Sequence, residues 1–252
     1  MVLNLWSTTL RMGSPPFRWC ANHSRVTLNV YSVNIMEEET SAVPVPAIRL
    51  TYRHGDLQRA LLQAGIEMAR EGGPGAVVLR EATRRAGVSA NAAYRHYADR
   101  AALLGAVCDA AQAALASAIE AEQDALAMTD DPAANAHARF RAVGTGYIRF
   151  ARAEPGLFRT AFSVPDNLER RGALTRAGQS GLTPFQLLET ALDGLVDAGV
   201  LAPQRRPGSE FLAWSAVHGL ATLLIDGPLR AAGSQQVEGI TQRLVAMVDE
   251  GI

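Results

Sequence analysis

Residues 79–104 constrain the fold more than any other stretch of this chain, and they read LREATRRAGVSANAAYRHYADRAALL. A short amphipathic helix at about 79–86 is expected to end before Gly87, because glycine readily adopts the left-handed turn that often follows a helix. Ser89 can cap a second short helix at about 90–97, and Asp99 can cap a longer third one. Two short helices joined by a glycine turn are the parts of a helix-turn-helix.

Apolar residues at helical spacing predict further helices on both sides of this stretch. Leu57, Leu61, Ala64 and Met68 fall on one face of a helix at about 55–71. Proline and glycine divide the rest into helices at about 100–127, 133–153, 156–162 and 184–199, followed by two that begin at the expected caps Ser209 and Ser234. The sequence shows neither strand alternation nor an internal repeat, so we predict an all-α protein with about nine helices.

The charges of the chain are unevenly distributed. Its formal net charge is −1, but residues 49–105 hold nine arginines and five acids, which leaves this segment at +4 and the remainder at −5. Lysine is absent, so arginine is the only strong phosphate-binding side chain. A basic module on an acidic body favours a nucleic-acid partner, with chance clustering as the alternative.

Length, composition and cysteine usage narrow the class of protein. A chain of 252 residues, of which 48% are hydrophobic, can form one large or two modest globular domains. Cys20 and Cys108 are far apart and have no metal-binding spacing, so we expect no metal site, no disulfide and a cytoplasmic location. The longest apolar stretch, 211–225, is too short to cross a membrane, so we expect no membrane association.

Residues 1–47 differ from the rest of the chain because isolated aromatic residues and four prolines interrupt any helical period. They lack the basic start and apolar core of a secretion signal. We expect a disordered or misassigned leader, with translation starting at Met36 so that residues 1–35 are not part of the protein. The alternative is an arm that lies on DNA.

The second short helix carries the residue types that read DNA. Ser89 places a hydroxyl and backbone N–H groups at a helix start, which favours a phosphate. Arginine reads guanine, asparagine reads adenine and alanine can contact a thymine methyl, so Arg95, Asn91 and Ala92 are the predicted base contacts. The full set of predicted DNA contacts is Arg80, Ser89, Asn91, Ala92, Tyr94, Arg95, His96 and Arg100.

Plainer interpretations exist for the rings in this segment. Tyr94 could pack in the core, and His96 could be an ordinary exposed polar residue. For Tyr97, three residues after Tyr94, we adopt the core interpretation and expect it to pack the second short helix onto the helix at 55–71.

The segments YRHGDLQRALLQAGIEMAREGG and LREATRRAGVSANAAYRHYADRAALLGAV closely resemble the amino-terminal domain of the tetracycline-repressor (TetR-like) family of bacterial regulators. The resemblance covers about residues 53–108, and its most specific part is RxAGVSxxxxYRHYxDRxxLL. It implies a three-helix DNA-binding domain at 48–99. The helix at 100–127 would connect this domain to a helical bundle, which makes up the rest of residues 100–252, binds a ligand and forms dimers. In the family's motif a tyrosine, a histidine and a basic residue contact phosphates, and these match Tyr94, His96 and Arg100.

The chain departs from the family pattern at three places. Tyr97 replaces the usual phenylalanine and Arg100 the usual lysine, and both changes preserve the chemistry. Ala90 and Ala92 stand where proline or glycine is common, which affects only the operator sequence that is read.

The carboxy-terminal half resembles one branch of the family, the Trp-His-Gly (WHG) type, through Trp214-Ser-Ala-Val-His218-Gly219 and the EPGLFRTAF segment at 154–162. Trp214 and His218 share a helix face, so His218 either donates to a ligand or forms a hydrogen bond in the core, and we favour the core interpretation. The predicted ligand site, an apolar one, consists of Tyr147, Phe150, Phe158, Phe162, Trp214 and His218.

Together these features predict a homodimeric, ligand-responsive transcriptional repressor that has no cofactor, metal or enzymatic activity. Two recognition helices would enter successive major grooves of a double-stranded, palindromic operator, about 34–36 Å apart. The last two helices would pair with those of a second copy, and a small apolar effector would shift the DNA-binding domains through the helix at 100–127. The alternatives are a helical enzyme and a protein-binding adaptor that use the aromatic cavity.

Overall fold

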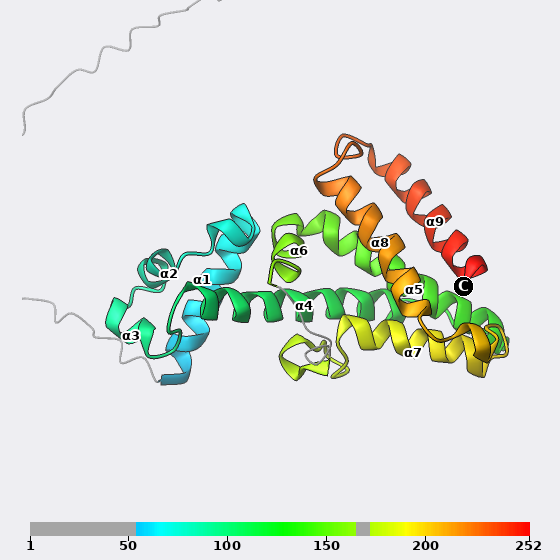
Figure 1. Ribbon diagram of the computed structural model, residues 1–252, viewed down its shortest axis with the longest axis horizontal. Helices are drawn as coiled ribbons and strands as arrows, with labels where there is room; N and C mark the ends of the chain where they lie inside the picture. The colour runs from blue at the N-terminus through cyan, green and yellow to red at the C-terminus, as the bar shows by residue number, and fades with distance from the viewer. Residues whose placement is uncertain (1–53, 165–171) are drawn as a thin grey trace, which may run out of the picture. The chain divides into compact units, whose positions relative to one another are not determined.

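The structure, a computed structural model, describes residues 54–164 and 172–252, and the predicted leader at 1–47 lies outside these residues. The described residues form nine α-helices and three short 3-10 turns, without a strand (Figure 1). The all-α prediction is therefore confirmed. Following the predicted domain boundary, we call residues 54–99 the head and the described residues from Arg100 onward the body; both belong to one compact unit.

The head contains α1 (His54–Gly72), α2 (Leu79–Arg85) and α3 (Ala90–Tyr94). Gly87 has a φ of 67° between α2 and α3, and the Ser89 hydroxyl oxygen accepts a hydrogen bond from the Ala92 N–H, so turn and cap are as predicted. α3 is shorter than the predicted 90–97 because Arg95 is already its C-cap. Tyr97, beyond the helix, is 4% exposed and belongs to the core.

Tyr97 faces α1, as the sequence predicts. Its hydroxyl interacts with Gln58 of α1, and burial of the ring raises the pKa of Tyr97 in spite of this hydrogen bond. The core of the head is completed by the apolar face of α1, in which Leu61, Ala64 and Met68 are buried.

Two helices of the body contact α1. A Cβ atom at Gly65 of α1 would lie 2.7 Å from the side chain of Val107, so α1 and α4 (Arg100–Asp124) approach closely here. At the carboxy-terminal end of α1, α6 (Pro155–Ala161) lies so close that a Cβ at Gly156 would be 2.6 Å from the carbonyl oxygen of Arg70. The Arg70 Nε also donates to Glu154 at 3.1 Å.

The body is completed by α5 (Pro132–Ala153), α7 (Pro184–Asp197), α8 (Ser209–Ile225) and α9 (Ser234–Gly251). α5 is central, because it packs against α4, α6, α7, α8 and α9 (Figure 1). Local sequence signals set the start of two of these helices: Asp131 caps α5, and Thr183 and Gln186 form a reciprocal capping box at α7.

The predicted caps of the last two helices are wrong, although the helices begin where expected. Gly208 and Gly233 are the N-caps of α8 and α9, and neither helix has a side-chain cap. Gly208 turns the chain with a φ of 84°, so Ser209 falls inside the first turn. There Ser209 is buried, and its hydroxyl donates to the Arg205 carbonyl at 2.6 Å.

Among the described residues, α4 is the one helix that is long and apolar enough to cross a membrane by length and composition alone. However, Leu115, Ala116 and Ile119 are completely buried, and α4 packs along α5 and α6. A core helix passes the same compositional test, so its apolar character is explained by packing inside the body.

Candidate DNA-binding surface and ligand cavity

α3 presents an exposed surface made of the predicted residue types. Asn91 and Arg95 are exposed, and Tyr94 is 58% exposed, which contradicts the alternative that Tyr94 packs in the core. Ala92 is half-buried beside them. Ser89 lies at the start of the helix, where its hydroxyl already serves as the cap.

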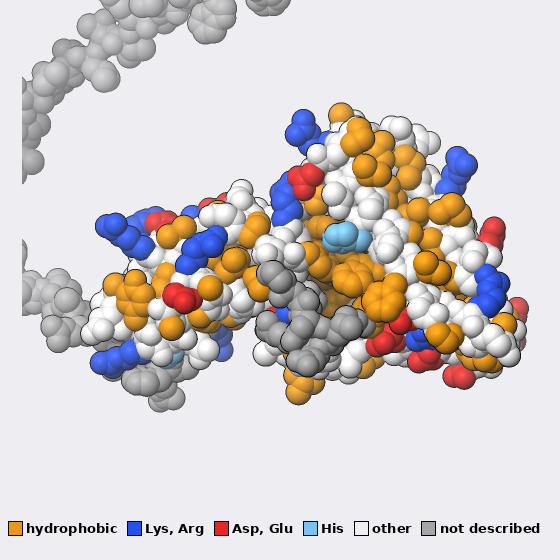
Figure 2. Space-filling model, viewed as in Figure 1, with side chains coloured by type: hydrophobic (Ala, Val, Ile, Leu, Met, Phe, Trp, Pro, Cys, Tyr) orange, Lys and Arg blue, Asp and Glu red, His pale blue; other side chains and the backbone are white. Residues whose placement is uncertain are grey.

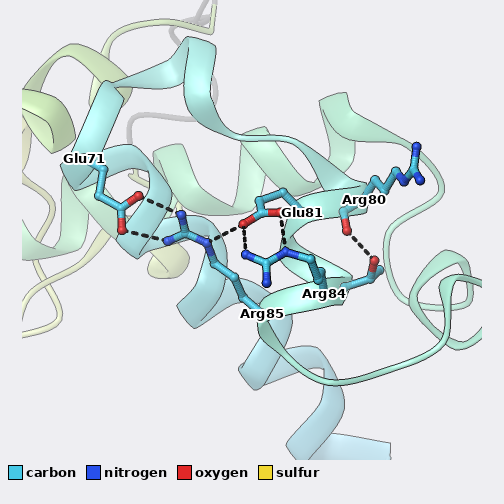
Figure 3. A network of polar contacts seen from close by, with 6 residues as sticks. Glu71, Arg80, Glu81, Arg84 and Arg85 are labelled. Carbon is cyan, nitrogen blue, oxygen red and sulfur yellow. Dashed lines mark hydrogen bonds and ion pairs between the residues drawn. The ribbon is translucent and has the colours of Figure 1, made fainter.

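The arginines at the end of α2 are engaged in ion pairs (Figure 3). Arg85 donates through both terminal nitrogens to Glu71 at 2.7 Å, and its Nε donates to Glu81 at 3.0 Å. Arg84 donates to the same Glu81 at 2.7 and 2.8 Å. Hydrogen bonds lower the pKa of Glu81 to about 2, with the larger effect from Arg84 and the smaller one from Arg85. The network joins the end of α1 to α2 and neutralises two of the basic residues that make the head positive.

Arg80 and Arg95 differ from these arginines. Both side chains are exposed, and neither has a hydrogen-bond or ion-pair partner within the residues that the structure describes. In Figure 3 the Arg80 side chain extends away from the network. Their charges are therefore available for phosphates or base edges, whereas those of Arg84 and Arg85 are matched by carboxylates.

Arg100 and His96 have partners inside the protein. The Arg100 Nε donates to the carbonyl oxygen of Val77 at 2.8 Å, and its Nη2 donates to that of Pro74 at 2.7 Å. His96 is half-buried and also interacts within the chain. The phosphate contacts expected of these two residues stay predictions.

The body contains a cavity of about 350 Å³ between α4, α5, α6, α7, α8 and α9. Three of the six predicted ligand-site residues, Tyr147, Phe162 and Trp214, line it. The rest of its wall is mostly aliphatic or aromatic, with polar atoms contributed by Gln112 of α4 and by Arg176. Such a concave, largely apolar space with few polar groups is typical of a small-molecule site.

The other three predicted residues, Phe150, Phe158 and His218, do not line this cavity. Phe158 lies behind Tyr147, with the two ring centroids 5.4 Å apart in an edge-to-face arrangement. Phe150 is buried in the same core. Ring contacts connect five of the six residues, all except Phe150, but only three of these five line the cavity.

A hydrogen-bonded trio joins Tyr147 and Trp214 of the cavity wall to His218, which does not line the cavity. The Trp214 Nε1–H donates to the Tyr147 hydroxyl oxygen at 3.2 Å, and this hydroxyl is 2.7 Å from the His218 Nδ1. The indole N–H can only donate, so the Tyr147 hydroxyl oxygen accepts from Trp214, and its O–H can donate to the Nδ1 of a neutral His218. Burial favours that arrangement, since it raises the pKa of Tyr147 and lowers the pKa of His218.

Family models match both halves of the chain. The model described as "Bacterial regulatory proteins, tetR family" matches residues 61–107, which include α2, α3 and the start of α4. The model described as "Tetracyclin repressor-like, C-terminal domain" matches residues 140–248, which contain most of the cavity wall. The chain is a TetR-like regulator. The match to the carboxy-terminal domain is also consistent with the Trp-His-Gly type.

Solved structures support the same fold for this TetR-like regulator. A protein of unknown function from Rhodococcus sp. RHA1 is 26% identical, with a TM-score of 0.63 over 81% of this chain and 99% of that one. The transcriptional regulator FadR from Bacillus subtilis, solved in complex with stearoyl-CoA, is 13% identical, with a TM-score of 0.56 over 77% and 98% of the two chains. No curated protein sequence matches the chain.

Sequence reasoning missed the charged part of the regulator's cavity wall. Arg176, in a 3-10 turn at Leu174–Arg176, is 2% exposed, and its Nε donates to Asp109 of α4 at 2.8 Å. Thr175 donates to the other carboxylate oxygen of Asp109 at 2.9 Å. The segment at 164–181 is polar and predicts a loop with one helical turn, so nothing in it indicates that an arginine is buried.

Proposed function

We propose that this TetR-like regulator is a ligand-responsive repressor that leaves a palindromic operator when a small apolar molecule fills the cavity. The observation that carries the proposal is the course of α4. This helix contributes Gln112 and Ile119 to the cavity wall, and its Val107 packs against Gly65 of α1. An occupied cavity can therefore act on the head through one helix.

The geometry of the head favours α3 as the recognition helix. Asn91, Ala92 and Arg95 are the base-reading residues of the proposal, because they combine solvent access with the residue types that recognise adenine, thymine and guanine. Ser89, Tyr94 and Arg80 would contact phosphates beside them. Arg80 and Arg95 are the strongest candidates, since no carboxylate in the described part of the chain neutralises them.

An apolar ligand is favoured because the polar groups around the cavity already bond to one another. The Gln112 Nε2 donates to the Ala161 carbonyl at 2.9 Å, and Arg176 is paired with Asp109. In the trio, the Trp214 indole N–H and the Tyr147 hydroxyl likewise have partners within the protein. A ligand that enters this space is recognised mainly by burial of apolar surface, so a molecule rich in polar groups would lose its hydration without adequate replacement.

The surface formed by α8 and α9 favours a homodimer. Hydrophobic side chains gather on the face of the body that α8 crosses (Figure 2), and Leu212, Leu223 and Met247 are 65%, 44% and 61% exposed. Gly219 lies on the same exposed side of α8, and a Cβ there would meet nothing within 4 Å. A helical glycine with open space around its Cβ position, among the described residues, is explained if the helix of a second copy lies against it. An isologous pairing of α8 and α9 would cover this surface.

The switch requires that the ligand bind one conformation of the dimer more tightly than the other. In the proposal, the conformation that the ligand binds more tightly holds the two recognition helices at a spacing that does not fit successive major grooves. A regulator of this kind works on the chromosome, so we place it in the cytoplasm. A helical enzyme and a protein-binding adaptor are the rival outcomes of the test.

The test is a mobility-shift assay of the full chain with the DNA upstream of its own gene, followed by footprinting of any complex. The proposal expects a two-fold symmetric footprint and a complex that contains two chains. A protein that shifts neither this DNA nor any duplex selected from random sequence contradicts the proposal and leaves the enzyme or the adaptor. Once an effector is found, the Trp214→Ala variant should stay on DNA when the effector is added. If the variant releases DNA at the same effector concentration as wild type, the effector does not bind at Trp214.

A further inference from the structure

Arg100 connects the first residue of α4 to the segment that precedes α2. Its Nε–H and Nη2–H donate to the carbonyl oxygens of Val77 and Pro74, which are 23 and 26 residues earlier in the chain. Pro74 begins a 3-10 turn (Pro74–Ala76), and Val77 is the C-cap of that turn. The next residue, Val78, is the N-cap of α2.

This contact closes a loop around the whole helix-turn-helix. The segment 78–99 carries both α2 and α3, and the residues directly before and after it, Val77 and Arg100, are joined by a hydrogen bond. The start of α2 is therefore fixed to the start of α4. Movement of α4 would move the start of α2 through this contact, without any change inside α3.

The chemistry of the contact requires arginine. Nε and one terminal nitrogen form one edge of a rigid planar fork, so a single guanidinium can donate to two carbonyl oxygens in a fixed geometry. A lysine ammonium is a compact group on a flexible chain and cannot reproduce that fork. Arg100 stands where the family pattern usually has lysine, so the departure noted in the sequence has a structural consequence.

We propose that Arg100 is a positioning residue for sequence recognition: it holds α2, and through α2 the recognition helix α3, at a fixed place relative to α4. The proposal rests on the proposed function as a DNA-binding regulator. It assigns the main effect of this side chain to the geometry of α2 and α3, in contrast to the phosphate contact that the family pattern implies. Two further contacts, Arg85 with Glu71 and Tyr97 with Gln58, tie the motif to α1, and the hydrogen bonds of Arg100 tie the segment before α2 to the start of α4.

The experiment compares Arg100→Lys and Arg100→Gln with the wild-type chain on two duplexes over a series of salt concentrations. One duplex is selected from random DNA by the wild-type protein, and the other has the same bases in scrambled order. We expect both variants to bind the selected duplex about tenfold more weakly and the scrambled duplex as well as wild type does. The dependence of binding on salt should stay unchanged for both. Arg80→Gln is the matched control, because loss of a phosphate contact should weaken both duplexes and lower the salt slope by about 0.9.

Rescue by lysine overturns the proposal. If Arg100→Lys binds the selected duplex like wild type while Arg100→Gln loses affinity for both duplexes and part of its salt slope, Arg100 is a phosphate contact. Wild-type binding by both variants would equally overturn it. Circular dichroism at the assay temperature detects a variant that has unfolded. Hydrogen exchange provides the second readout: the backbone amides of α2 should exchange faster in both folded variants. Unchanged protection of these amides would contradict the positioning role of Arg100. A wild-type chain that selects no duplex at all is a different result, which rejects the proposed function together with this inference.

Discussion

Arginine is used in different ways in the head and in the body. In the head, Arg84 and Arg85 form ion pairs at the surface, and Arg80 and Arg95 extend from it without partners in the described residues. In the body, Arg176 is buried at the cavity wall with Asp109 as its counter-charge. The same kind of side chain therefore lies on the exposed surface of the head and, as Arg176, in the buried wall of the cavity.

The difference follows from what each region meets. A surface that binds a polyanion benefits from charges that remain hydrated until the phosphates replace water and counterions. A cavity that accepts an apolar molecule cannot leave a charge unmatched, because an isolated ion in a low-dielectric interior is strongly destabilising. Variants that alter one kind of arginine or its counter-charge at a time test this contrast between the head and the body.

Breaking the buried pair should have the largest effect. Asp109→Asn removes the carboxylate that accepts a hydrogen bond from the buried Arg176, and we expect the free energy of unfolding to fall by about 3 kcal/mol. Urea denaturation at a fixed protein concentration measures it, because dimerisation makes the apparent stability depend on concentration. The double variant Asp109→Leu/Arg176→Met removes both charges and should recover most of the loss. A single variant as stable as wild type would mean that the pair is not held in a dry environment.

The next effect concerns DNA affinity and separates the two kinds of arginine in the head. Arg95→Gln and Arg80→Gln should each weaken operator binding by about tenfold or more. Arg84→Gln should change it much less, because this guanidinium is already paired with Glu81. Arg95→Gln should also broaden the range of sequences selected from random DNA. Equal losses for all three variants would show that net charge alone decides binding.

Short-range signals explain why much of the head could be predicted from the sequence. Gly87, Ser89 and Asp99 act on backbone groups within three residues, so turn and caps follow from local chemistry. The WHG spacing likewise places Trp214 and His218 on one helix face. These features depend on neighbours along the chain, and the structure has them where the pattern predicts.

Long-range partners explain what the sequence did not reveal. Tyr147, which completes the trio, is 71 residues from His218, and no periodicity links them. Arg100 bonds to backbone carbonyls, whose accessibility depends on how the turn before α2 is folded. The burial of Arg176 contradicts the usual exposure of arginine, and α4 brings the carboxylate of Asp109 to it as a counter-charge.

A smaller effect should separate the two regions by pH. Burial lowers the pKa of His218 below the ordinary value of 6.5, so the unfolded chain takes up a proton first as the pH falls. The stability that the folded protein has with His218 neutral is present above pH 6.5 and is lost as the pH falls below 6.5. In the head, the pKa of Glu81 is lowered to about 2, so its contribution is lost only between pH 4.5 and 2. Between pH 7.5 and 5.5 wild type should therefore lose up to about 1 kcal/mol more than His218→Asn in urea denaturation. An equal loss in both proteins would mean that His218 does not titrate in this range.

The smallest effect is expected from an arginine of the body that stays in water. Arg149 pairs with Glu122 at 2.6 Å and lies 3.6 Å from Glu238, but its side chain is 53% exposed. Solvent screens such a pair, so Arg149→Gln should change the free energy of unfolding by less than about 0.5 kcal/mol, in contrast to the loss expected for Asp109→Asn. Urea denaturation of both variants in parallel checks this, with high salt as a further control that should leave the Asp109 effect intact. A loss at Arg149 as large as that at Asp109 would mean that the number of ion pairs, and not their burial, determines the stability of the body.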